Sequence, residues 1–292
     1  MTKLLITVAI CCACFKSFCN TNKLSKFGNT EIKRLVVVGE RCSGTNYVSK
    51  LLLRNFPTLV PTLEFGHKHF LWWFDSPYDK EKLSRVGYNS KHITLKDSGD
   101  CLFVFVIRNP YDWLRSFYQS PHHVHGDLLE QGFVHFINHL WKSQDIFRYQ
   151  LLEDLNPFTN LPFKNILDLR NFKNRNYLKL GKLVKNFTVV RYETVAENPQ
   201  KFIENVAAQY NLKSTTDFVP IFSYKGEGTK NFKKKKYRTL NHETLSYINN
   251  ELDWELEHQL GYEKQKTKSW IYRLMKKIER KCRKLFFSNG ET

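Results

Sequence analysis

Short apolar runs alternate with stretches of helical periodicity along the body of the chain. Three runs, at residues 35–38, 102–107 and 187–191, are dominated by β-branched, aromatic and leucine residues. Continuous runs of this kind are typical of parallel strands that are buried on both faces. The pattern therefore predicts an α/β domain with a central, mainly parallel sheet flanked by helices.

Apolar residues at helical spacing occupy much of the remaining chain. We expect helices at residues 45–55, 127–150, 199–210 and 242–260, and another after Asn109-Pro110. Pro157 and Pro162 make residues 156–175 loop-like. The aromatic segment at residues 57–91 is expected to be irregular.

The two ends of the chain differ from its body. Residues 1–20 combine a lysine, an apolar run and a small, polar stretch, the pattern of a signal peptide or a short signal anchor. A hydrophobic strand or helix packed on the domain is the alternative. Residues 21–33 are polar and read as a tether, residues 34–262 as one domain, and residues 263–292 as a basic amphipathic helix. That helix would either lie on a membrane surface or dock on the domain.

The net charge of +18 points to acidic partners. Nucleotide-like cofactors, sulfated or carboxylated glycans, nucleic acid and anionic membranes all fit this charge. The three cysteines outside the N-terminal segment are too far apart in sequence for a disulfide framework, so they do not identify a redox compartment.

A glycine-bracketed turn follows the first predicted strand. Gly39 and Gly44 have the GxxxxG spacing of a phosphate-binding P-loop, in which backbone amides and a helix N-terminus face an anion. Loops for nucleoside triphosphates continue with Lys and then Ser or Thr, whereas this chain has Thr45 and Asn46. An ATPase or GTPase therefore loses its main support. The alternatives that remain are an anion site and an ordinary strand-turn-helix corner.

A second polar site is expected where the strand 102–107 ends. Arg108 lies at its carboxyl end, the edge at which open α/β sheets bind ligands, and Ser116 lies about two turns into the next helix. An arginine fork and a hydroxyl at this place can bind a terminal phosphate. A triphosphatase would instead need a magnesium-binding aspartate.

These segments resemble sulfotransferases that use 3'-phosphoadenylyl sulfate (PAPS). The match lies in SGTN at residues 43–46 and RNPYDWLRSFY at residues 108–118, which are similar to that family's 5'-phosphosulfate loop and 3'-phosphate motif. The string GERCSGTNY with Lys68-His69 most resembles a branch whose members begin with GERxSGTN. Segments 189–199 and 224–232 match more weakly. The resemblance implies a P-loop NTPase-like sulfotransferase fold over most of residues 35–262.

The resemblance also implies the site residues and requires no metal. Cofactor binding falls on Arg41, Ser43, Gly44, Thr45, Asn46, Arg108, Ser116, Tyr192, Lys225 and Gly226. Catalysis falls on His69 as the base, with Lys68 and Arg41 steadying charge on the departing phosphate. Many sulfotransferases have Lys or Arg where this chain has Cys42, so Arg41 takes that role; if its side chain points away, Lys68 serves alone.

Imidazole titrates near working pH and suits the removal of a hydroxyl proton. A packing histidine is the alternative for His69, and Glu64 and Asp97 are substitute bases. Trp141 and the histidines at positions 122, 123 and 125 would line an acceptor pocket or belong to the core.

The expected activity is sulfuryl transfer from PAPS to a hydroxyl or amine of an unidentified acceptor: a glycan, lipid, peptide or small alcohol. We expect no nucleic-acid partner. The rival hypotheses are a P-loop kinase and a non-enzymatic binder of polyanions or membranes. The expected location is the secretory pathway, in the Golgi lumen or membrane, with bacterial export or the cytoplasm as alternatives.

Overall fold

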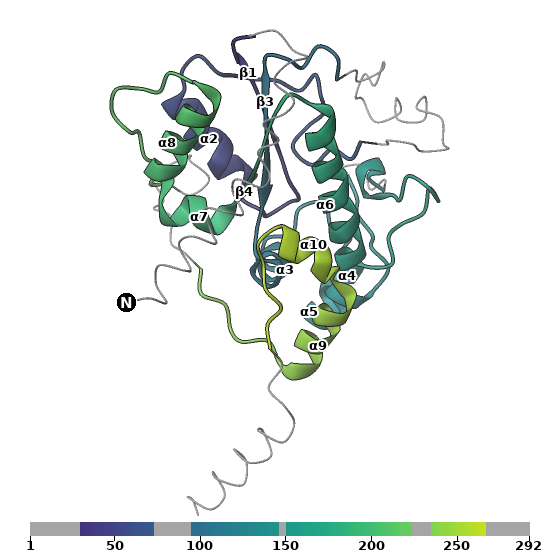
Figure 1. The fold of residues 1–292 in the computed structure, drawn as a ribbon. Coiled ribbons are helices and arrows are strands. Elements are labelled where there is room, and N and C mark those ends of the chain that lie inside the picture. The colour runs from purple at the N-terminus through teal and green to yellow at the C-terminus, as the bar shows by residue number, and fades with distance from the viewer. Residues whose placement is uncertain (1–29, 73–94, 146–149, 224–234, 267–292) are drawn as a thin grey trace, which may run out of the picture.

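A four-stranded parallel sheet lies at the centre of the molecule (Figure 1). The computed structural model describes residues 30–72, 95–145, 150–223 and 235–266. The strands, in the order β2-β1-β3-β4, are β1 (Arg34–Val38), β2 (Val60–Pro61), β3 (Cys101–Ile107) and β4 (Asn186–Arg191). The predicted α/β class is confirmed, and the three predicted strands are present; β2 was not predicted.

The sheet register explains the uninterrupted apolar runs. β3 pairs with β1 on one side and β4 on the other, and all seven of its residues are buried. Leu102 and Val104 face one layer of the core, whereas Phe103 and Phe105 face the other. The chain leaves β1 for β2 on one side and continues to β3 on the other. The carboxyl end of β1 is therefore a topological switch point, where open α/β sheets bind ligands.

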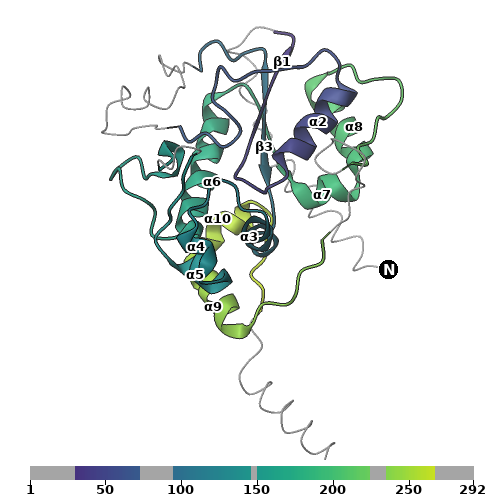
Figure 2. The same ribbon diagram turned by 180° about the vertical axis from the view of Figure 1, so that it is seen from behind.

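Three helices cover one face of the sheet (Figures 1 and 2): α2 (Thr45–Asn55), α7 (Tyr192–Glu197) and α8 (Pro199–Tyr210). The stripe of Val48, Leu51 and Leu52 on α2 is fully buried in this layer. The helical periodicity of residues 45–55 and 199–210 predicted both longer helices correctly.

The other face packs against α6 (Ile166–Leu183) and α10 (Trp254–Gln259) (Figure 2). Tyr177 of α6 lies with its ring centroid 4.9 Å from that of Phe105. Beyond the carboxyl ends of the strands, a separate aromatic core joins α3 (Pro110–Gln119), α4 (Asp127–Glu130), α5 (Phe133–Asn138) and α9 (His242–Glu251).

Two predicted helices and one predicted loop were wrong in extent. Residues 127–150 do not form one helix, because Gly132 adopts a φ of 90° between α4 and α5 and the chain turns extended after α5. Residues 156–175 are not all loop: α6 begins after Asn165, whose side chain accepts hydrogen bonds from two amides of the first turn. Residues 242–260 divide into α9 and α10, and Asp253 caps the second helix.

The predicted tether ends earlier than expected. Ile32 is buried in the core, and the Lys33 amide donates to the Asp100 carbonyl. Residues 1–29 and 267–292 lie outside the described part, and so do the predicted signal segment and the basic helix. In the part that is described, no helix has the length and apolar character needed to cross a membrane.

Candidate functional site

The loop from Gly39 to Gly44 connects β1 to α2 and passes close to two neighbours. A Cβ added at Gly39 would lie 2.3 Å from the Val106 carbonyl oxygen. Gly44 has a φ of 96°, and a Cβ there would lie 2.3 Å from the Tyr192 ring. No described side chain caps the N-terminus of α2. Its first-turn amides therefore suit an anion, since such amides lack partners within the helix.

Arg108 links the second predicted motif to this loop. Its Nη1 donates to the Cys42 carbonyl at 3.1 Å, and its Nη2 donates to the Tyr237 hydroxyl at 3.3 Å. The guanidinium lies 4.9 Å from the centre of the Tyr192 ring. Its Nε is buried and has no hydrogen-bond partner among the described residues. Arg108 is thus fixed beside the loop, with one buried donor still to be satisfied.

Both motifs line one cavity of about 410 Å³, here called the Arg108 cavity. The predicted cofactor residues on its wall are Arg41, Gly44, Thr45, Asn46, Arg108, Ser116 and Tyr192. Lys68, His69 and Lys235 also line it. The structure therefore brings the loop and the Arg108–Ser116 pair to a single space.

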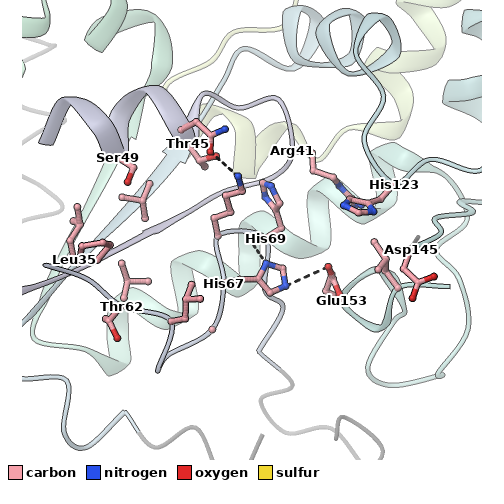
Figure 3. A pocket seen from close by; sticks show the side chains of 18 residues that line it. Leu35, Arg41, Thr45, Ser49, Thr62, His67, His69, His123, Asp145 and Glu153 are labelled. Carbon is pink, nitrogen blue, oxygen red and sulfur yellow. Dashed lines mark hydrogen bonds and ion pairs between the residues drawn. The ribbon is translucent and has the colours of Figure 1, made fainter. Parts of the chain in front are cut away.

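A second cavity of about 650 Å³ lies beside the first and is here called the Glu153 cavity (Figure 3). The residues that border both cavities are Arg41, Thr45, Asn46, Lys68, His69 and His123. Two spaces with a common border suit a reaction between two bound molecules, and His69 lies at that border.

Gly39 of the loop forms hydrogen bonds with Lys68 through its amide and with His69 through its carbonyl group. The Gly39 amide donates to the Lys68 carbonyl at 2.8 Å, and His69 Nδ1 lies 2.6 Å from the Gly39 carbonyl oxygen. The Lys68 ammonium donates to Asn46 Oδ1 at 2.7 Å. A segment that follows β2 is thereby held against the loop that follows β1.

The contact with Gly39 decides the tautomer of His69. A carbonyl oxygen can only accept a hydrogen bond, so Nδ1 carries the proton and Nε2 keeps a lone pair. Burial lowers the pKa of His69 to about 3, so the ring is neutral around pH 7. A neutral imidazole with an unprotonated Nε2 can accept a proton, but a pKa of about 3 makes it a weaker base than the near-neutral value that suits general-base catalysis.

His67 has the opposite tautomer. Its Nδ1 accepts the His69 amide at 3.1 Å, which places the proton of the neutral ring on Nε2. That Nε2 is turned toward Glu153 and lies 3.5 Å from Oε1 (Figure 3). Burial lowers the pKa of His67 to about 4 and raises the pKa of Glu153. His67 therefore offers a hydrogen-bond donor toward the carboxylate.

Arg41 belongs to a buried cluster of four charged residues. Its Nε lies 2.8 Å from Glu40 and its Nη2 lies 2.6 Å from Asp154. Lys173 bridges the same two carboxylates at 2.8 and 2.9 Å and donates to the His69 carbonyl at 3.3 Å. Burial alone would favour the neutral acids, but Arg41 and Lys173 lower the pKa of Glu40 and Asp154. Sequence reasoning missed Glu40, which belongs to the loop, and Asp154 and Lys173, which contact the loop from other segments.

Several predicted residues lie elsewhere. Ser43 is buried in the loop but lines neither cavity. Glu64 and Asp97 both contact Arg34 at the start of β1, at the opposite end of that strand from the loop. Trp141 is a core residue whose Nε1 donates to Asp154, so it is not an acceptor-pocket residue.

Of the three neighbouring histidines, His122 and His123 line the Arg108 cavity, whereas His125 pairs with Asp127. Lys225 and Gly226 lie outside the described residues.

No family model, curated protein or solved structure matches this chain.

Proposed function

We propose that this chain is a PAPS-dependent sulfotransferase with a P-loop NTPase-like sulfotransferase fold. One observation carries the proposal: the Gly39–Gly44 loop, Arg108 and Ser116 line one cavity, which meets a second cavity at His69. The first space has the donors that a bisphosphorylated nucleotide needs at two separate points. The second space leaves room for a molecule that accepts the sulfuryl group.

In this arrangement the Arg108 cavity binds PAPS. Thr45, Asn46 and the first-turn amides of α2 bind the phosphosulfate, because a helix N-terminus favours an anion. Arg108 and Ser116 bind the 3'-phosphate, which would also satisfy the buried Nε of Arg108. Tyr192 packs against Gly44 and Arg108 and forms the wall of the cavity near the adenine of PAPS.

The reaction is an in-line displacement at sulfur. His69 Nε2 takes the proton of the acceptor hydroxyl while its oxygen bonds to sulfur. The bond from sulfur to the bridging phosphate oxygen breaks, and 3'-phosphoadenosine 5'-phosphate (PAP) leaves with that electron pair. Lys68 stabilises the developing charge, whereas Arg41, already engaged by Glu40 and Asp154, holds the loop. Catalysis is then positioning together with preorganised electrostatics.

Calorimetry with PAP tests the proposal. We expect Arg108→Ala to weaken PAP binding by about 1.5–3 kcal/mol, because a charge-assisted hydrogen bond to phosphate is lost. The matched control is Arg54→Ala, which removes the same charge from the far end of α2, where Arg54 donates a hydrogen bond to the Pro220 carbonyl. PAP affinity should be unchanged in that variant. Equal affinities in wild type and Arg108→Ala would remove the assignment.

A second measurement separates the rival functions. A kinase should be stabilised against heat by ATP with magnesium more than by PAP, and a sulfotransferase should show the reverse. A non-enzymatic polyanion binder should keep heparin or liposome binding in Arg108→Ala and transfer no labelled sulfate.

Location in the secretory pathway or Golgi stays a prediction, which microscopy of the tagged full-length chain would test.

A further inference from the structure

The Glu153 cavity lacks the positive excess of the Arg108 cavity. With histidines counted as neutral, its described lining has two basic residues, Arg41 and Lys68, and two acidic residues, Asp145 and Glu153. The lining of the Arg108 cavity has four basic and two acidic residues. A chain with a net charge of +18 therefore places no excess of cations around its larger cavity.

Internal partners already engage the two basic residues of the Glu153 cavity. Arg41 pairs with Glu40 and Asp154 in the buried cluster, and the Lys68 ammonium donates to Asn46. An anion in this cavity would therefore have to compete with Glu40 and Asp154 for Arg41. Lys68, an ammonium with three N–H donors, lies at the border with the Arg108 cavity, where the proposed sulfuryl donor binds. Glu153, whose side chain is 14% exposed, would also repel an anion.

The rest of the wall offers both donors and acceptors beside an apolar surface. Ser49 and Thr62 contribute hydroxyl groups, and His67 presents the edge of a neutral ring. The apolar part of the wall comes from Pro61, Leu63 and Leu151. A hydroxyl-rich molecule suits such a wall, because each hydroxyl donates and accepts while its C–H faces pack against apolar side chains.

We infer that the acceptor is an uncharged, hydroxyl-rich molecule and that Glu153 makes the site reject anionic analogues. The inference rests on the proposed function and adds the chemical class of the acceptor. An ammonium group suits the site less well, because the Lys68 ammonium lies at the border where the transfer takes place, whereas the charge of Arg41 is balanced by Glu40 and Asp154.

Octyl glycosides of different charge test the inference. Labelled sulfate transfer from PAPS would be measured to octyl glucoside, octyl galactoside and octyl N-acetylglucosaminide, and to octyl glucuronide and octyl 2-amino-2-deoxyglucoside. We expect kcat/KM for at least one neutral glycoside to exceed that for the glucuronide and the aminoglucoside at least tenfold. Glu153→Gln should reduce the ratio of kcat/KM for the neutral glycoside to kcat/KM for the glucuronide at least fivefold. Glu153→Asp, which keeps the charge, should leave that ratio unchanged.

Calorimetric PAP affinity, expected to be unchanged in both variants, separates failure of the acceptor class from failure of the proposed function. PAP binding without transfer to any neutral glycoside, or preferred transfer to the glucuronide or the aminoglucoside, overturns the acceptor class. An unchanged preference in Glu153→Gln overturns the role of Glu153. If Glu153→Gln does not fold, Asp145→Asn removes the other acidic charge of the Glu153 cavity at a half-buried position and should reduce the same ratio. Failure to bind PAP contradicts the proposed function itself, and the inference falls with it.

Discussion

At His69, one hydrogen bond decides which ring nitrogen can accept a proton. The Gly39 carbonyl requires the hydrogen on Nδ1, and burial keeps the ring neutral by lowering its pKa to about 3. We therefore expect NMR of the ring nitrogens to show a protonated Nδ1 and an unprotonated Nε2 from pH 7.5 down to pH 5. A proton on Nε2, or a transition near pH 6.5, would contradict this state.

The matching variant is His69→Gln, which also assigns the NMR signal. It should lower sulfate transfer by about 10²–10⁴-fold, the usual contribution of a general base. PAP affinity should fall far less than transfer, because the proposed role of His69 concerns the acceptor proton, although its ring also lines the Arg108 cavity and contacts Gly39.

The loop glycines and Arg108 were predictable because turn chemistry and strand ends are local properties of the sequence. The partners of Arg41 were not predictable in this way. Asp154 lies 113 residues further along the chain, and the buried cluster exists only because α6 brings Lys173 toward the end of β1. Arg41 was therefore predicted as a phosphate contact without the two acids that hold it in the structure.

Among the elements, the junction of β1 and α2 depends most directly on a glycine. Gly44→Ala would require a left-handed backbone and would place a Cβ against the Tyr192 ring. Strain in sparsely populated backbone regions costs about 1–3 kcal/mol, so we expect a lower free energy of unfolding in urea and weaker PAP binding. Gly126→Ala is the control, since its φ is −54° and an added Cβ would lie 3.6 Å from Glu130 Oε1, an ordinary van der Waals contact. Equal stability of the two variants would show that the loop rearranges without cost.

Elements with one dominant local signal were predicted well, and those set by their surroundings were not. β3 and α2 each have a clear apolar pattern. The two-residue strand β2 has none and exists because Val60 and Pro61 pair with β1. The helix predicted at residues 127–150 followed real apolar spacing, but Phe136 and Trp141 reach the same aromatic core from separate segments.

For the whole molecule, the buried histidines predict how stability changes with pH. Unfolded histidines titrate near pH 6.5, whereas the folded pKa values are about 4 for His67 and about 3 for His69. Between these values the unfolded chain binds more protons, so stability is complete above pH 6.5 and falls as the pH drops toward 3. The lowered pKa values of Glu40 and Asp154 act in the same direction at still lower pH.

Melting temperatures from pH 7.5 to 4.5 check this expectation. The double variant His67→Gln/His69→Gln should lose part of the acid-induced decrease, whereas the exposed His139→Gln should retain it. The same decrease in the double variant would mean that both imidazoles are solvated in the folded protein.

The border shared by the two cavities limits the order of events in the proposed reaction. Because His69 and Lys68 belong to both spaces, donor and acceptor meet only while both are resident. The proposed reaction then requires a ternary complex. The sulfuryl group passes directly from donor to acceptor, without a covalent intermediate on a side chain of the protein.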